Sequence, residues 1–181
     1  MSEDLLRASG GASLSAVNRV DVQPAEDAET LDAVRMLVRS HLLAHSETHD
    51  PATTEAIAAA LPAPYDAPRG GIWVARAGTD VVGCVALQPL DDDIAELKRL
   101  YVRPAWRGRG VARQLAGRAV AEARGRGYRH LRLGTLDSMI PAQKLYESLG
   151  FRRIAPYRPV ELGDTLFYEL TLDDELTRAT R

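Results

Sequence analysis

Cysteine is nearly absent from this chain, whose 181 residues contain a single one, Cys84. One cysteine excludes an internal disulfide framework and any zinc site built from several thiolates. Cys84 lies in the strand-like run VVGCVAL, where a cysteine usually packs as a small buried hydrophobic residue. Buried cysteines are generally unreactive. We therefore assign Cys84 to the core and expect no thiol nucleophile.

The chain also lacks a hydrophobic run long enough to cross a bilayer. Its first 17 residues, MSEDLLRASGGASLSAV, include acidic residues and no long apolar core, unlike a secretory signal peptide. These two absences predict a cytoplasmic protein with no membrane partner. A strong net charge is missing as well, since the formal value is −2 at pH 7. The molecule as a whole is therefore not built to bind a polyanion such as nucleic acid.

The composition is typical of one globular domain. Apolar residues make up 45% of the chain and charged residues 27%, an ordinary mixture for such a domain, and the length suffices for one core. We expect a flexible tail over residues 1–17, which are rich in Ser, Gly and Ala, and a short C-terminal tail over residues 173–181. The folded domain is expected over residues 18–172, without an internal repeat.

Hydrophobic periodicity predicts alternating strands and helices. Strands are expected at residues 18–24, 71–77, 81–90, 94–102, 128–136, 151–157 and 165–172, and helices at residues 25–47, 53–62, 111–124 and 137–150. Asp137 or Ser138 is the expected N-cap of the last helix. One unit of strand, helix and parallel strand is embedded in antiparallel pairing. The prediction is thus a mixed α/β fold with a central, mostly antiparallel twisted sheet flanked by helices.

The stretch RGRGVARQLAG, residues 107–117, places two glycines where an amphipathic helix is predicted to begin. A glycine-rich turn before a helix exposes backbone N–H groups at the positive end of the helix dipole, an arrangement that binds phosphate. A Walker A loop is excluded because the chain has no Gly-Lys pair. A dinucleotide fingerprint is disfavoured because Arg113 stands in place of its third glycine. The pattern that fits is Arg/Gln-x-x-Gly-x-Gly/Ala, with Arg107, Gly110 and Ala112, and the alternative is an ordinary glycine turn.

The segment around this turn is strongly basic. Between Lys98 and Arg132 the sequence has eleven Lys and Arg residues and one acidic residue, Glu122. A local positive field would attract phosphate groups although the whole chain is nearly neutral. The alternative is that the chain prefers arginine throughout, which would explain part of this excess without a functional role.

The segment LYVRPAWRGRGVA, residues 100–112, followed at this separation by AQKLYESLGF, residues 142–151, resembles the GNAT superfamily of N-acetyltransferases. The resemblance covers residues 71–172 well and the N-terminal helices more loosely. It implies acetyl-CoA as co-substrate, a primary amine as acceptor, a pyrophosphate cradle before the helix, and pairing of the preceding strand with the pantetheine arm. A backbone amide of that strand would stabilise the thioester oxygen. The cradle residues would be Arg107, Gly108, Arg109, Gly110, Val111 and Ala112, and the strand residues Leu100, Tyr101 and Val102.

Two side chains are candidates for proton transfer. Tyr146 lies in KLYESLGF, where the family often places its general acid, and a phenol suits protonation of a thiolate; the alternative is a tyrosine at the core edge. Glu96 is the candidate base, acting directly or through water, because a regular strand would turn it to the same face as Val102. A bulge would change that alternation. The structural alternative for Glu96 is an ion pair with Lys98 or Arg99.

One position departs from the family pattern. Many members have asparagine three residues before the alanine of A-x-x-LY, and here that position is Met139, which cannot donate a hydrogen bond to the cofactor arm. Either a backbone group takes over this contact or the site handles the arm differently. The histidines His41, His45 and His49 are spaced by four but lack a third convincing ligand, so no metal site is predicted.

The acceptor is not specified by the sequence. In this superfamily the N-terminal helices and the loop after them usually shape acceptor choice, which points to LPAPYDAPRGG, residues 61–71, with Tyr65 as a candidate pocket wall. A small amine, an amino acid and a protein amine all stay open as acceptors, as does a homodimer paired through a sheet edge. Two other functions are alternatives: a non-catalytic acyl-CoA-binding domain and a basic nucleic-acid-binding module.

Overall fold

The computed structural model describes residues 20–43, 50–66, 68–159 and 165–172. The two expected tails, residues 1–17 and 173–181, lie outside these ranges. The described strands are β1 (Asp21–Pro24), β2 (Gly71–Ala77), β3 (Asp80–Pro89), β4 (Ile94–Val102), β5 (His130–Leu136), β6 (Arg152–Ile154) and β7 (Thr165–Thr171). The described helices are α1 (Ala28–Leu43), α2 (Pro51–Ala60), α3 (Val111–Gly125) and α4 (Ile140–Ser148), with a short 3₁₀ turn, η1, at Pro104–Trp106.

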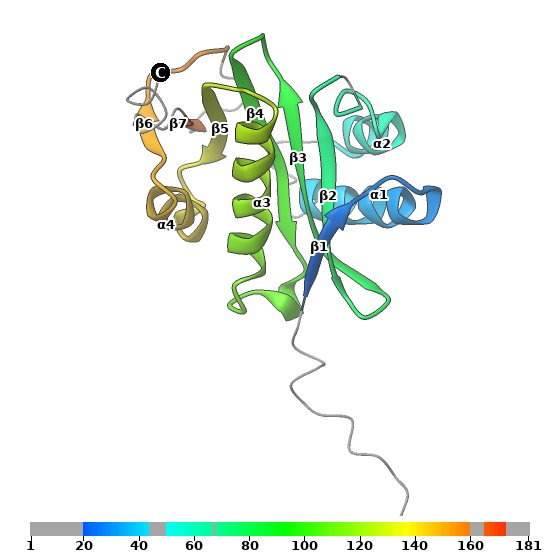
Figure 1. Cartoon of the computed structure of the whole chain (residues 1–181). Helices are drawn as coiled ribbons and strands as arrows, with labels where there is room; N and C mark the ends of the chain where they lie inside the picture. Colours follow the sequence, from blue (N-terminus) through cyan, green and yellow to red (C-terminus); the bar gives the residue numbers. More distant parts are fainter. Residues whose placement is uncertain (1–19, 44–49, 67, 160–164, 173–181) are drawn as a thin grey trace, which may run out of the picture.

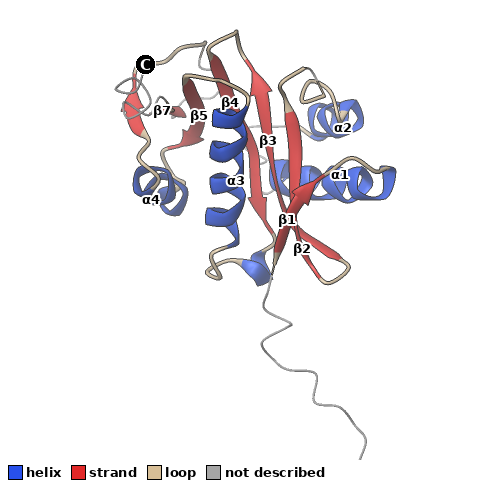
Figure 2. Cartoon of the chain, in the orientation of Figure 1, coloured by secondary structure: helices blue, strands red, loops and turns tan. Residues whose placement is uncertain are grey.

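The strands form one sheet in the order β1-β2-β3-β4-β5-β7-β6 (Figure 2). Neighbouring strands are antiparallel, except for β4 and β5, which are parallel and joined through α3. The predicted mixed α/β architecture is therefore confirmed. The predicted strand over 151–157 is too long, because β6 ends at Ile154.

Helices cover both faces of the sheet. In Figure 1, α3 crosses one face, and α1 and α2 lie behind the other. Two separate hydrophobic clusters result, one between the sheet and the helices α3 and α4, the other between the sheet and α1. The spacing of Val34, Leu37, Val38 and Leu42 turns one stripe of α1 into the second cluster. We call these two sides the α3 face and the α1 face.

Strand β4 contains a bulge that inverts its alternation. Ala86 pairs with Lys98 and Cys84 with Tyr101, so Arg99 and Leu100 together oppose a single residue of β3. Arg99 takes the left-handed φ of 55°. As a result Val102 and Leu97 belong to the α3-face cluster, whereas Tyr101 belongs to the α1-face cluster. The predicted common face of Glu96 and Val102 is therefore wrong, because the bulge lies between them.

Strands β4 and β5 pair over a very short distance. Their register runs from Ile94↔His130 to Glu96↔Arg132 and then ends, although β4 continues to Val102 and β5 to Leu136. Beyond Glu96 the edge of β4 that faces β5 therefore has no strand partner among the described residues. Backbone N–H and C=O groups on such an edge are available to an extended ligand.

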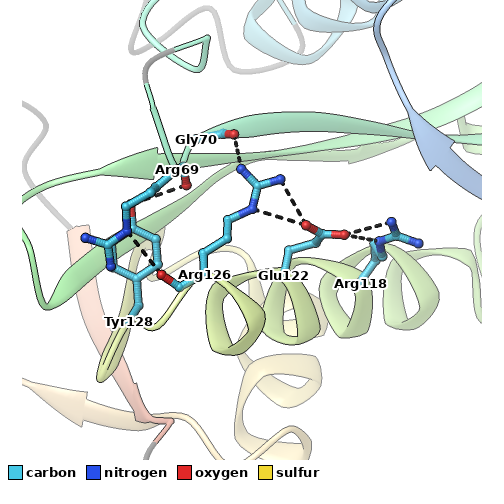
Figure 3. A network of polar contacts seen from close by, with 6 residues as sticks. All are labelled: Arg69, Gly70, Arg118, Glu122, Arg126 and Tyr128. Atoms are coloured by element: carbon cyan, nitrogen blue, oxygen red, sulfur yellow. Dashed lines mark hydrogen bonds and ion pairs between the residues drawn. The ribbon is translucent and has the colours of Figure 1, made fainter.

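The far end of α3 is fastened to the start of β2 (Figure 3). Glu122 accepts hydrogen bonds from Arg118 at 2.8 Å and from Arg126 at 2.9 and 3.1 Å. Arg126 also donates to the Gly70 carbonyl, and Arg69 donates to the Arg126 carbonyl at 3.1 Å. The only acidic residue of the basic segment is thus shared by two arginines, and the C-terminal end of α3 is held in place.

Candidate functional site

The glycine turn forms an open, uncapped helix start. Gly108 and Gly110 have φ values of 73° and 79°, and a Cβ on either would meet nothing within 4 Å. Glycine is thus required here by backbone conformation, and the space beside the turn is free of protein. Gly110 is the N-cap of α3 and offers no side chain to the first-turn amides. These N–H groups, at the positive end of the helix, suit an anion.

Three arginines lie in or next to this turn, and each makes a different contact. Arg107 donates from Nε to the Val102 carbonyl at 3.0 Å, which ties the turn to the end of β4. The guanidinium carbon of Arg109 lies 4.9 Å from the centre of the Trp106 ring. Arg113 donates to Ser148 Oγ at 2.8 Å, joining α3 to α4. Residues 107–110 are exposed, whereas the Val111 side chain is buried in the core, so a ligand could reach Val111 only through its backbone.

Tyr146 sits on α4 in the α3-face cluster. Its side chain is 6% exposed, and its ring lies 5.8 Å from the Phe151 ring and 6.5 Å from the Tyr168 ring. Burial raises the pKa of its phenol well above the ordinary value of 10. The hydroxyl has no hydrogen-bond partner within the described part of the chain. Tyr146 is thus a protonated phenol at neutral pH, in an apolar setting on the α3 face.

Glu96 is buried on the opposite side of the sheet. Only 2% of its side chain is exposed, and Ala95 and Leu97 on either side of it face α3, so Glu96 points to the α1 face. Its Oε1 accepts a hydrogen bond from Tyr157 Oη at 2.6 Å and another from Arg158 Nε at 3.3 Å. Lys98 Nζ lies 3.3 Å from Oε2. The predicted pair with Lys98 is present, whereas Arg99 binds elsewhere.

Tyr157 and Arg158 were not predicted as site residues. They follow β6 in a turn, and both reach Glu96 across the β4–β5 opening. The centre of the Tyr157 ring lies 4.9 Å from that of Phe167 in an edge-on arrangement, and the guanidinium carbon of Arg132 lies 5.1 Å from the centre of the Tyr157 ring. Burial, followed by the hydrogen bond to Glu96, raises the pKa of the Tyr157 phenol. The only sequence signal was a Tyr-Arg pair between two prolines, APYRP.

Met139 precedes α4 as its N-cap, where Asp137 or Ser138 was expected. It provides no side-chain cap. Instead Gln143 Nε2 donates to the carbonyls of Leu136 at 3.2 Å and Asp137 at 2.7 Å. The expected cap is therefore wrong, because a side chain from inside the helix holds the loop. The Met139 sulfur accepts from Thr135 Oγ1 at 3.5 Å, close to the end of β5.

Tyr65 is buried and connects the loop after α2 with the bulge of β4. Its hydroxyl accepts a hydrogen bond from Arg99 Nε at 2.9 Å. It also lines a hollow of about 360 Å³ that extends to Arg118 and Arg126, at the C-terminal half of α3. The Tyr65 hydroxyl itself lies against Arg99 and close enough to Glu96 for that carboxylate to raise its pKa. Next to it, the His41 ring lies 5.3 Å from the Tyr101 ring.

Cys84 is confirmed as a buried core residue. Its side chain is 1% exposed, its Sγ donates to the Arg99 carbonyl at 3.4 Å, and burial raises the pKa of the thiol to about 12. We expect the folded protein to give no reaction with a thiol reagent at pH 8 over minutes, and one thiol per chain after unfolding in guanidinium. Rapid reaction of the folded protein would contradict this burial.

The described residues contain no group of three His, Cys, Asp or Glu side chains placed to hold a metal ion. His45 and His49 lie outside the described residues. None of the described helices has the length and apolar character needed to cross a membrane.

Three features together fit a ligand with phosphates and an extended arm. The uncapped α3 start would bind its phosphates, the free edge of β4 would bind its arm, and Tyr146 and Glu96 lie on opposite faces of the sheet. Acetyl-CoA has these parts.

The sequence model of the Acetyltransferase (GNAT) family matches residues 35–151. An uncharacterized N-acetyltransferase of Schizosaccharomyces pombe is 36% identical over 111 residues, which are 60% of this chain and 68% of that protein. The N-acetylaspartate synthetase of Danio rerio is 44% identical over 92 residues, which are 50% of this chain and 33% of that protein. The chain thus spans about a third of the length of this second relative.

Solved structures share the fold. An acetyltransferase from Salmonella typhimurium, determined with its cofactor acetyl-CoA, matches with a TM-score of 0.69 and 24% identity. The match covers 87% of this chain and 96% of that chain. At this identity the likeness shows the fold.

Proposed function

Because the chain belongs to the GNAT family of acetyltransferases, whose co-substrate is acetyl-CoA, we propose that it acetylates a primary amine of a small, amino-acid-like acceptor. Transfer occurs by direct attack of the amine in a ternary complex. The name of the Danio rerio relative, an N-acetylaspartate synthetase, supports an amino-acid-like acceptor.

The observation that supports this proposal most strongly is that two features lie next to each other in the fold. The uncapped start of α3 follows directly after the end of β4, and β4 has a free edge from Leu97 onward. In the proposed complex the amides of residues 107–112 bind the pyrophosphate. The backbone of Leu100, Tyr101 and Val102 binds the pantetheine arm, and the bulge turns an amide toward the thioester carbonyl. Met139 adds an apolar contact at the opposite side of the opening.

When bound, acetyl-CoA supplies an activated acetyl group as a thioester. In the reaction the amine nitrogen forms a bond to the acetyl carbon, and the carbon–sulfur bond breaks. The proton of the amine passes to Glu96, directly or through water, and the departing thiolate takes a proton from Tyr146. Because these two groups lie on opposite faces of the sheet, we assign them to the two ends of the reaction separately. Cys84 takes no part because it is buried and protonated.

Thermal unfolding tests the proposed cradle. The purified chain is heated alone and with acetyl-CoA, CoA, ATP or NAD at equal concentration. A ligand at a hundred times its dissociation constant stabilises the fold by about 2.7 kcal/mol, so both CoA forms should raise the melting temperature by several degrees. ATP and NAD should have little effect because they lack the pantetheine arm. The absence of any shift with either CoA form would contradict the proposal.

Gly110→Val provides the matched variant for this experiment. A β-branched residue at a φ of 79° is strained, by about 1–2 kcal/mol, and its side chain would enter the space left beside the turn. The variant should melt at a slightly lower temperature and lose the shift with CoA.

The alternative functions predict other results. Steep salt-dependent affinity for DNA would favour a nucleic-acid-binding module, and CoA binding without thiol release on any amine would favour a non-catalytic domain. A dimer, which stays a prediction, is measured by light scattering.

A further inference from the structure

The surroundings of Glu96 hold more positive charge than this carboxylate can balance. Lys98 and Arg158 both contact Glu96, each at 3.3 Å. Arg99 follows Lys98 on the same strand, and its Nε donates to the neutral Tyr65 hydroxyl at 2.9 Å. It makes no ion pair with a carboxylate of the described residues. The nearby Arg132 is already paired with Glu169 at 2.7 Å. Among the described residues, two cations thus contact the Glu96 carboxylate and a third, Arg99, lies at the Tyr65 hydroxyl on which Glu96 also acts, an excess of two positive charges.

This excess is not explained by the phosphates of acetyl-CoA. The proposed phosphate cradle begins after Val102, six residues beyond Glu96, and a strand rises about 3.3 Å per residue. The two regions are therefore about 20 Å apart along β4. The cradle also has its own arginines, at positions 107, 109 and 113. The cations around Glu96 belong to the other end of the site, where the acceptor must reach the acetyl group.

Arg99 is held in a fixed position for a ligand. It is one of two non-glycine residues in the described chain with a left-handed φ, a conformation that the surrounding structure must maintain and that recurs at functional sites. The bulge and the Tyr65 hydroxyl hold its guanidinium on the α1 face. Burial raises the pKa of Tyr65, Arg99 lowers it, and Glu96 raises it, so both charges act at the same hydroxyl.

Arg158 spans the opening between the parting strands. Its Nε donates to Glu96 on β4. Its Nη2 lies beside Gly134 of β5, 3.3 Å from the position that a Cβ on this glycine would take. A guanidinium has five N–H donors, and Glu96 accepts from one of them. The planar fork of the remaining donors suits a carboxylate.

We propose that the acceptor is an amine that carries at least one carboxylate, and that Arg99 and Arg158 bind this carboxylate. The inference rests on the proposed acetyl transfer. Two half-buried guanidinium groups with an excess of two charges favour a dicarboxylic amino acid over a neutral amine and exclude a polyamine, whose ammonium groups they would repel. Lys98 pairs with Glu96 at 3.3 Å, and Glu96 lies beside the amine to be acetylated.

The experiment measures kcat/KM for three acceptors with the same skeleton: L-aspartate, L-asparagine and L-asparaginamide, which carry two, one and no carboxylate. The full chain is supplied with saturating acetyl-CoA, and the release of CoA thiol is recorded. Cys84 adds no background because it is buried. For the native protein we expect kcat/KM to fall by about 10-fold or more for each carboxylate removed, since a hydrogen bond to a charged group is lost each time. Putrescine should be the poorest acceptor.

The variants Arg99→Gln and Arg158→Gln then test the assignment. Each should lower the ratio of kcat/KM for L-aspartate to kcat/KM for L-asparaginamide by about 10- to 100-fold through the KM of L-aspartate, with no change in the stabilisation by CoA. Because Arg158 also contacts Glu96, this ratio, rather than the rate on one acceptor, reports the binding of the carboxylate. Arg99→Lys should recover part of the loss. Comparing variants on one acceptor series cancels the differing basicity of the amines. Arg158→Gln keeps the test valid if Arg99→Gln fails to fold.

Arg69→Gln is the matched control. Like Arg99, Arg69 has a left-handed φ, is half-buried, and donates from Nε to a neutral oxygen, the Arg126 carbonyl. It lies at the far end of α3 (Figure 3), so its loss should leave the acceptor series unchanged. Equal rates with all three acceptors, or equal losses on all three in the variants, would overturn the carboxylate assignment while acetyl transfer stands. Absence of thiol release with these acceptors, putrescine and a wider amine panel would overturn the proposed function itself.

Discussion

Replacing Tyr146 by phenylalanine is expected to lower kcat by about 100-fold or more, the usual loss when a general acid is removed. The thiolate of CoA would then leave without a positioned proton donor. The fold should be little affected, because phenylalanine keeps the ring contacts with Phe151 and Tyr168 and the lost hydroxyl has no partner in the described chain. Thiol release gives kcat, and thermal unfolding with CoA shows that binding is intact.

Tyr168→Phe is the control for this prediction. Tyr168 is also buried, lies in the same aromatic group, and within the described residues donates its hydroxyl to Glu147, at 3.4 Å. It should retain nearly full activity. The kcat of the native protein should also show no alkaline decline below pH 10. Burial raises the pKa of Tyr146 above 10, so the phenol keeps its proton up to that pH. An unchanged kcat in Tyr146→Phe would reduce Tyr146 to a core residue.

Replacing Glu96 by glutamine is expected to have two effects of different origin. The first is a loss of about 100-fold or more in kcat/KM, because the amide cannot accept the proton of the amine. The second is a lower stability, by about 2 kcal/mol, because Lys98 and Arg158 lose the carboxylate that pairs them. This figure is below that of a fully buried pair, since their side chains are 27% and 34% exposed. Denaturant unfolding measures the second effect.

The pH profile separates these two effects. If Glu96 takes the proton, the variant should gain rate steadily as pH rises and the free amine accumulates, whereas the native protein levels off at a lower pH. If Glu96 only positions Tyr157 and Arg158, both proteins should show profiles of the same shape at different heights. Glu169→Gln is the matched control, because Glu169 also pairs with an arginine, Arg132, on the same sheet. It should lose stability without this change of profile.

Most of the fold could be predicted from the sequence because local signals agree with it. Strands β2 and β4 begin and end at the predicted residues, and α3 begins at the predicted Val111. Their boundaries are set by neighbouring glycines, aspartates and prolines, which act locally. Helix α2 begins two residues early because Asp50 caps it, accepting from the amides of Ala52 and Thr53 at 2.9 Å. The β7 position between β5 and β6 depends on long-range pairing, which periodicity does not indicate.

The site was predictable in part for the same reason. The glycine turn is a local feature, and its residues share an unusual backbone that only glycine adopts easily. The Glu96 cluster joins β4 to the turn after β6, across 61 and 62 residues of sequence, so no short pattern could reveal it. The bulge at Arg99 comes from the mismatch with β3. The bulge could therefore be recognised only once the pairing of β4 with β3 was known, and it changes which side chains lie on the same face as Glu96.

The three-residue pairing of β4 with β5 makes a narrow hydrogen-bonded join between two parts of the sheet. One part is β1 to β4 with α1 and α2, and the other is β5 to β7 with α4. Besides residue pairs 94–96 and 130–132, the parts are joined by α3, by the hydrophobic cluster beneath it, and by the bonds of Tyr157 and Arg158 to Glu96. A ligand that contacts both edges adds hydrogen bonds to this narrow join, so its binding energy also holds the parts together. Occupancy should thus govern how often the join opens, and the free protein should exchange its edge amides with solvent more rapidly than the liganded one.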